Sequence, residues 1–74
     1  MSTRELNEIA SSRTRELRTK LGLTQREAAE LAGVSLRHYR KIEAGGFENI
    51  RLATVGKLAR AFGVEAWELI DGKI

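Results

Sequence analysis

Cysteine and proline are both absent from this 74-residue chain, and it has no long apolar run. Without cysteine the chain can form no disulfide bond, has no thiolate nucleophile and offers no thiolate ligand to zinc. No apolar run approaches the ~18 residues of a membrane-spanning helix, and no signal-peptide core follows Met1. We therefore expect a cytoplasmic protein that is stabilised by helix packing and by any self-association it undergoes.

The chain is long enough for one domain with a small core. Its net charge of +3 is unevenly distributed, because residues 1–45 hold 9 Lys/Arg against 6 Asp/Glu, whereas residues 46–74 hold 4 of each. Positive charge concentrated in one part favours a polyanionic partner, since phosphate binding releases counterions. Charge alone does not separate a nucleic-acid-binding domain from an ordinary basic one.

Helical spacing of apolar residues dominates the chain, and strand-like alternation is hard to find. A capping box at residues 2–5 predicts a first helix, whose inward stripe consists of Leu6, Ala10, Thr14, Leu17 and Leu21. A fourth helix is marked by Leu52, Val55, Leu58, Ala59 and Phe62, and a short fifth helix by Trp67, Leu69 and Ile70. With the two helices described next, the sequence predicts an all-α fold of five helices.

The segment between Thr24 and Gly45 predicts two short helices joined by a tight turn. The first follows a capping box at residues 24–27 and ends at Gly33, with Ala28, Leu31 and Ala32 on its inward face. The second is capped by Ser35 and extends over residues 36–44. Helices joined so closely must cross steeply. Ala29 is small enough for the crossing, and Val34 would fill the core beneath the turn.

The second of these helices has two different faces on a helical wheel. Tyr39 and Ile42 lie on one side and are expected in the core. The opposite side carries Arg37, Arg40, Lys41 and Ala44, flanked by Leu36 and His38. A face with three cations and no acid suits the groove of a DNA duplex. Arginine can donate two hydrogen bonds to guanine, and a leucine can contact a thymine methyl group.

These residues also resemble a known family. The motifs are Leu23-Thr24-Gln25, Ala28-Ala29, Leu31-Ala32-Gly33-Val34-Ser35, Ile42-Glu43-x-Gly45 and Leu58-Ala59-x-Ala61-Phe62-Gly63-Val64. In this order and spacing they are similar to the Cro/C1-type, or XRE-like, helix-turn-helix family of phage repressors and bacterial transcriptional regulators. The resemblance covers roughly residues 10–72. It implies a single compact five-helix, lambda-repressor-like domain over residues 1–74, with the helix-turn-helix at about 24–44 and a short N-terminal extension at about 1–8.

The resemblance implies sequence-specific binding of double-stranded DNA. The base-reading positions of the recognition helix match Leu36, Arg37 and Lys41, with Arg40 near the bases or the backbone. The phosphate-contacting positions match Gln25, Asn49 and Arg51, and we add Ser35 and His38 at the start of the recognition helix. His38 is alternatively a plain surface residue. Relatives also pair an arginine and a glutamate at the positions of Arg18 and Glu43 in an inward salt bridge; the alternative is that both are solvated.

Three residues depart from the family pattern. Glu48 places an acid where many relatives are neutral or basic, Gly56 interrupts the fourth helix, and Trp67 replaces a usually small polar residue. We expect Trp67 in the contact of a homodimer that binds a palindromic operator, or alternatively in the core of its own chain.

The leading functional hypothesis is a transcriptional repressor. The alternative is an antitoxin-like module that masks a partner protein such as a toxin and also binds DNA. An enzyme is not expected, because the sequence contains no paired carboxylates, metal-ligand spacing or nucleotide-binding loop. We also expect no cofactor, no metal ion and no membrane partner.

Overall fold

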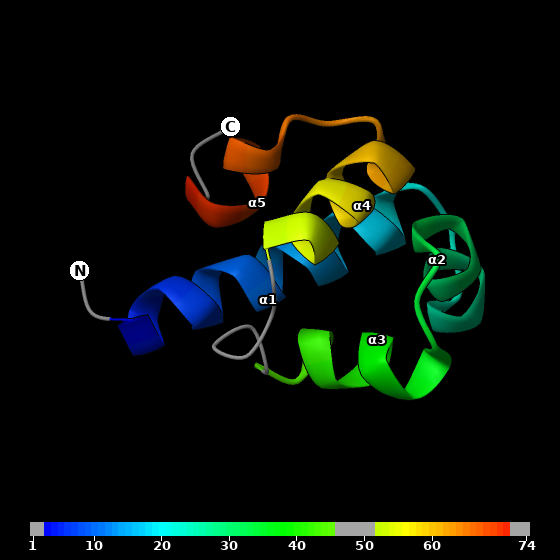
Figure 1. Ribbon diagram of the computed structural model, residues 1–74, viewed down its shortest axis with the longest axis horizontal. Helices are drawn as coiled ribbons and strands as arrows, with labels where there is room; N and C mark the ends of the chain where they lie inside the picture. The colour runs from blue at the N-terminus through cyan, green and yellow to red at the C-terminus, as the bar shows by residue number, and fades with distance from the viewer. Residues whose placement is uncertain (1–2, 46–51, 72–74) are drawn as a thin grey trace.

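The computed structural model describes the backbone of residues 3–45 and 52–71 and the side chains of residues 8–45 and 52–70. Five helices form this part of the chain: α1 (Thr3–Lys20), α2 (Gln25–Ala32), α3 (Leu36–Glu43), α4 (Leu52–Phe62) and α5 (Ala66–Asp71). They are shown in Figure 1, and the described residues contain no strand. The prediction of an all-α fold with five helices is confirmed.

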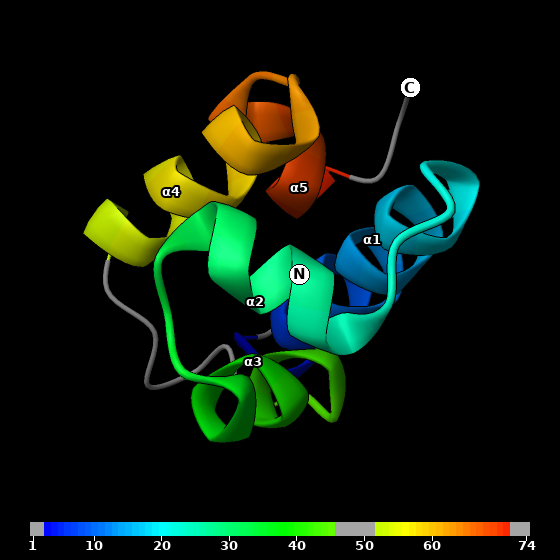
Figure 2. The ribbon, with the colours of Figure 1, turned by 90° about the vertical axis from the view of Figure 1, so that its right-hand side faces the viewer.

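The long helix α1 packs against α3, α4 and α5, whereas α2 packs against α3 and α4. Figures 1 and 2 show α3 along one side of the molecule and α5 toward the opposite side. The core lies between them, and its largest fully buried side chains are Tyr39, Ile42, Leu58, Leu69 and Thr14. Tyr39 and Ile42 come from the inner face of α3, as predicted, so α3 is attached by one face and leaves the other open.

Local capping residues set the ends of α2 and the start of α3. The Thr24 hydroxyl accepts a hydrogen bond from Glu27 N at 3.0 Å, and the Glu27 carboxylate accepts one from Thr24 N at 2.8 Å. The backbone hydrogen bond from Thr24 also lowers the pKa of Glu27. Gly33 ends α2 in the left-handed conformation with φ 71°, and Ser35 caps α3 by accepting from His38 N at 3.0 Å. The predicted turn between the two helices is therefore present, with Val34 packed against the core.

Leu21 and Leu31, which the sequence placed on inward faces, are exposed, so this part of the prediction is wrong, and Leu52, one of the residues that marked the fourth helix, is exposed as well. Leu21 lies just beyond the end of α1, where the chain has already left the helix. Leu31 lies at the border of α2, whose buried face consists of alanines at positions 28, 29 and 32. Leu52 is the first residue of α4 and is 82% exposed. Small residues form the buried face of α2 because the helices cross closely there.

Two expected boundaries are refined by the structure. Helix α3 ends at Glu43, and Ala44 is its C-terminal cap instead of its last residue. Of the extension expected at about residues 1–8, the described part from Thr3 onward belongs to the same helix as the rest of α1. The capping box proposed for the start of α1 includes Ser2, which lies outside the described residues.

Candidate nucleic-acid interface

The outer face of α3 presents the basic residues that the sequence singled out. Arg37, Arg40 and Lys41 are exposed, and Leu36 is half-buried at the start of the helix. No other described helix covers this side of α3 in either view of the ribbon (Figures 1 and 2). The helix therefore offers an uncovered cationic face of about two turns.

The only acidic side chain of α3 is directed away from this cationic face. The Glu43 side chain is 4% exposed, and it pairs with Arg18 of α1, whose side chain is 15% exposed. Arg18 Nε donates to Glu43 Oε2 at 2.6 Å, and Arg18 Nη2 donates to Oε1 at 3.2 Å. The third guanidinium nitrogen, Nη1, donates to the carbonyl oxygen of Leu23 at 2.8 Å. This bidentate pair ties α1 to the end of α3.

The surroundings of Glu43 keep it ionised. Burial by itself would raise the pKa of the carboxyl group, but the hydrogen bonds led by Arg18 outweigh burial and lower it. The same hydrogen bond raises the pKa of Arg18. Both partners are therefore charged at neutral pH, and the negative charge of Glu43 is neutralised inside the molecule.

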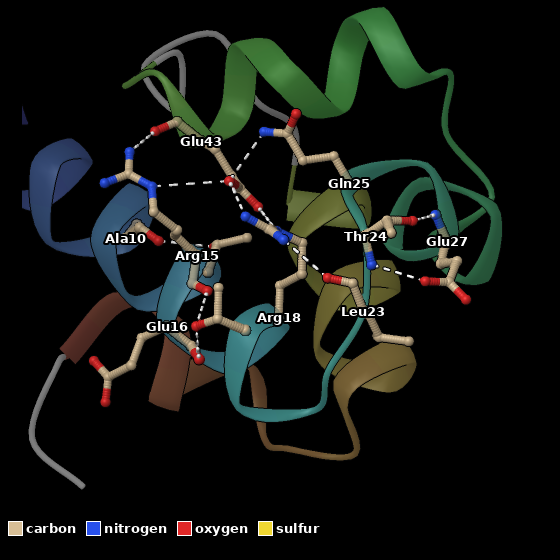
Figure 3. A network of polar contacts seen from close by, with 11 residues as sticks. Ala10, Arg15, Glu16, Arg18, Leu23, Thr24, Gln25, Glu27 and Glu43 are labelled. Atoms are coloured by element: carbon tan, nitrogen blue, oxygen red, sulfur yellow. Dashed lines mark hydrogen bonds and ion pairs between the residues drawn. The ribbon is translucent and has the colours of Figure 1, made fainter.

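Gln25, expected at a phosphate, also contacts Glu43. Its Nε2 donates to Glu43 Oε1 at 3.2 Å, so Arg15, Arg18 and Gln25 converge on one carboxylate from two helices (Figure 3). An amide group carries two N–H donors. The contact with Glu43 uses one and leaves the second for another acceptor.

The other predicted phosphate contacts lie in different places. The Ser35 side chain caps α3 as an acceptor, which leaves its own O–H free to donate, and His38 is exposed on the flank of the same helix. Both thus lie at the N-terminal end of the cationic face. Asn49 and Arg51 lie outside the described residues, as does Glu48.

Sequence reasoning missed two side chains of α1 that contact the end of α3. Ser11 Oγ donates to the carbonyl oxygen of Ile42 at 2.7 Å, and Arg15 Nη2 donates to that of Glu43 at 2.8 Å. Both contacts join residues about thirty positions apart in the sequence. The available signal was the spacing of Ser11, Arg15 and Arg18, which places three polar side chains on one face of α1.

Trp67 is not part of this basic region. It lies on α5, on the opposite side of the molecule from α3, and is 51% exposed. Among the residues that the structure describes, no cluster of His, Asp or Glu is arranged to hold a metal ion. No described helix has both the length and the apolar character that crossing a membrane requires.

Two comparisons with known proteins fit this arrangement. A family model described as "Helix-turn-helix" matches residues 15–67. The crystal structure of the restriction-modification controller protein C.AhdI from Aeromonas hydrophila matches with a TM-score of 0.78 and 36% sequence identity, covering 85% of this chain and 94% of that one. Neither comparison supports the toxin partner that the sequence analysis kept open.

A third similarity covers only a small segment of a much larger protein. The glutamine–fructose-6-phosphate aminotransferase of Methanocaldococcus jannaschii is 35% identical over 66 residues, which are 89% of this chain and 6% of that protein. Its enzymatic name therefore does not extend to this chain. The matching family and the similar solved structure are regulatory in kind, and the fold and basic helix agree with them: the chain belongs to the Cro/C1-type helix-turn-helix family of DNA-binding transcriptional regulators.

Proposed function

We propose that this protein represses transcription by inserting α3 into the major groove of a specific operator. The observation that carries the proposal is the outer face of α3, where three cations are exposed while the only acid of the helix is buried and paired. An α-helix fits the major groove, and arginine and lysine there donate to guanine O6 and N7. Such a protein acts by occupying DNA in the cytoplasm and not by catalysis.

Each predicted side chain receives a role in this arrangement. We assign base contacts to Leu36, Arg37, Arg40 and Lys41, and phosphate contacts to Gln25, Ser35, His38, Asn49 and Arg51. The second N–H of the Gln25 amide would reach a phosphate oxygen while the first stays on Glu43. Phosphate contacts fix the orientation of the protein, and base contacts select the sequence.

Among classes of regulator, the similarity to C.AhdI supports control of restriction–modification genes. The similarity extends over nearly the whole of that protein at 36% identity. Under this proposal the protein binds upstream of a neighbouring restriction or modification gene. Footprinting of those upstream regions with purified protein tests the assignment, and protection confined to unrelated promoters would contradict it.

Selection of bound sites from a random pool of double-stranded DNA tests the main proposal. We expect one enriched motif with two inverted halves, because two-fold symmetric regulators bind palindromic sites. The same selection with the Arg37→Ala variant serves as the matched comparison and should yield a motif relaxed at one base pair in each half. Enrichment of no motif by the unmodified protein would refute sequence-specific binding.

A further inference from the structure

We infer that Ser11 and Arg15 are positioning residues, which hold the C-terminal half of α3 in place and thereby set the base preference of that half. The inference rests on the proposed function, because it concerns how α3 reads DNA. Neither residue belongs to the helix-turn-helix or to the predicted contact set.

The starting point is the end of α3, where backbone carbonyl groups have no partner within the helix. The last four carbonyls of any α-helix are left in this position, and they are satisfied by side chains, water or backbone N–H groups of the following turn. At the end of α3, Gly45 N already donates to the carbonyl oxygen of Ile42 at 3.2 Å, so the α1 side chains add to this backbone bond. In α3 the carbonyl oxygens of Ile42 and Glu43 accept hydrogen bonds from Ser11 Oγ (2.7 Å) and Arg15 Nη2 (2.8 Å). Helix α1 thus provides a C-terminal cap for α3 through contacts that span 31 and 28 residues of the sequence.

This cap is part of a continuous row of contacts between one face of α1 and the end of α3. Ser11, Arg15 and Arg18 are spaced by four and three residues, so they lie on one face of α1. Along that face they engage the carbonyl of Ile42, the carbonyl of Glu43 and the carboxylate of Glu43 in turn. Ser11 is buried, and the positive charge of Arg15 lies at the negative end of the α3 dipole, which strengthens its bond.

The two ends of α3 are consequently held by different parts of the molecule. The Ser35 cap and the turn behind it hold the N-terminal end, which carries Arg37. The α1 side chains hold the C-terminal end, which carries Lys41 one residue before Ile42. A base-reading side chain must be held within about 0.5 Å of its productive geometry. Loss of the cap should therefore disturb the base pair read by Lys41 and spare the one read by Arg37.

A direct contact with a DNA phosphate is the alternative role for Arg15, and the experiment must distinguish it from the positioning of α3. Its side chain is 56% exposed, so a direct contact with a DNA phosphate is geometrically open. Removing a phosphate contact weakens binding to all sequences alike and reduces the salt dependence of binding by about 0.9 in log–log slope. Removing a positioning contact leaves that slope unchanged and lowers discrimination at particular base pairs.

The experiment compares Ser11→Ala and Arg15→Ala with Lys57→Ala, an exposed cation of α4 that serves as the charge control. Dissociation constants are measured for the selected operator and for each single base-pair variant of it, at several salt concentrations. Arg37→Ala and Lys41→Ala first locate the base pair that each side chain reads. Circular dichroism melting verifies that every variant is folded at the binding temperature.

We expect Ser11→Ala and Arg15→Ala to lower discrimination at the Lys41 base pair by about 3- to 10-fold, the worth of one net hydrogen bond. Discrimination at the Arg37 base pair and the salt slope should match those of the Lys57→Ala control. Unchanged discrimination at both base pairs overturns the inference, and so does a uniform loss with a reduced slope. Because Arg15 is largely exposed, Arg15→Ala decides the matter even where Ser11→Ala fails to fold. If Arg37→Ala and Lys41→Ala leave base preference unchanged, the proposed function itself fails.

Discussion

Glu43 and Arg18 form the ion pair on which the end of α3 depends, and breaking it should destabilise the fold. The Glu43 side chain is almost fully buried and Arg18 keeps slight exposure. Removing one partner leaves the other as an unpaired charge, which costs 3–5 kcal/mol in deeply buried pairs. For Arg18→Ala or Glu43→Ala we expect a loss of about 3 kcal/mol in the free energy of unfolding, near the lower end of this range.

Urea unfolding of the two single variants and the double variant measures this pair directly. The double variant should lose much less than the sum of the single losses, because it leaves no stranded charge. A coupling free energy below ~0.5 kcal/mol would contradict a structural role for the pair.

The lowered pKa of Glu43 predicts how stability depends on pH. A carboxyl group with a lower pKa in the folded state stabilises the protein above its unfolded-state pKa, here 4.5. This contribution is lost as the pH falls through the folded-state value. Between neutral pH and acid below 4.5, the Glu43→Gln variant should therefore lose less stability than the unmodified protein. Glu27 titrates in both proteins, so the difference between their pH profiles reports Glu43, and Glu30→Gln is the exposed control.

Arg37 and Gln25 should differ in what their loss does to DNA binding. Arg37→Ala removes a base contact and should cost about 1–3 kcal/mol on the selected operator while relaxing one base pair. Gln25→Ala should weaken binding to all sequences alike, because phosphates carry no sequence information. Competition binding with operator variants measures both. An unchanged motif with Arg37→Ala would show that α3 is not placed in the groove as proposed.

At the scale of single helices, replacing Gly33 and replacing Gly56 by alanine should change the stability of the fold in opposite directions. Gly33 ends α2 at φ 71°, a conformation that costs other residues roughly 1–2 kcal/mol, so Gly33→Ala should destabilise by about that amount. Gly56 lies inside α4 without a positive φ, and an added Cβ would meet nothing within 4 Å. Gly56→Ala should therefore stabilise by about 0.5–1 kcal/mol. Chemical denaturation of the two variants at low protein concentration measures the change in the free energy of unfolding for each. Changes of the same sign would contradict this prediction.

The elements that could be predicted from the sequence are those whose signals are local. Thr24, Gly33 and Ser35 act on backbone groups within a few residues, so their roles follow from short motifs. Leu31 shows where this reasoning ends. On a helical wheel it lies about 110° from the centre of the buried face of α2, a border position that the partner helix decides. Leu21 lies beyond the last residue of α1, where a helical wheel no longer applies, and Leu52 is the first residue of α4, where no preceding turn covers its side chain.

The candidate site likewise has one part that follows from the local sequence and one part that does not. The cationic face of α3 follows from its own eight residues, whereas the partners of its last carbonyls come from α1, about thirty positions earlier. No local pattern encodes a contact of that range. The only signal in the sequence was the spacing of polar residues along α1, which places them on one face of that helix.

At the scale of the whole molecule, the predicted dimer is the property that the proposed function most requires. One module reads only a few base pairs, which is too little for selectivity among the sites of a genome. Two-fold dimers place their recognition helices about 34 Å apart on one face of DNA. Trp67 and Ile70 are exposed on α5, which lies toward the opposite side of the molecule from α3 (Figure 1).

We therefore expect two chains per palindromic site, with Trp67→Ala weakening the association of the copies. Sedimentation of the free protein and of its DNA complex measures this. Leu31→Ala, which trims an exposed apolar side chain on α2, is the matched control. A tight one-to-one complex on a half-site, unaffected by Trp67→Ala, would exclude this arrangement.

Helix α1 packs directly against both α3 and α5. If a second copy docks on α5, α1 contacts both the helix that receives the copy and the end of the DNA-reading helix. Dimerisation and operator binding are then thermodynamically linked, and the linkage is reciprocal. The factor by which a partner copy raises affinity for DNA equals the factor by which DNA raises affinity between the copies. A small change in protein concentration is thereby converted into a steep change in operator occupancy.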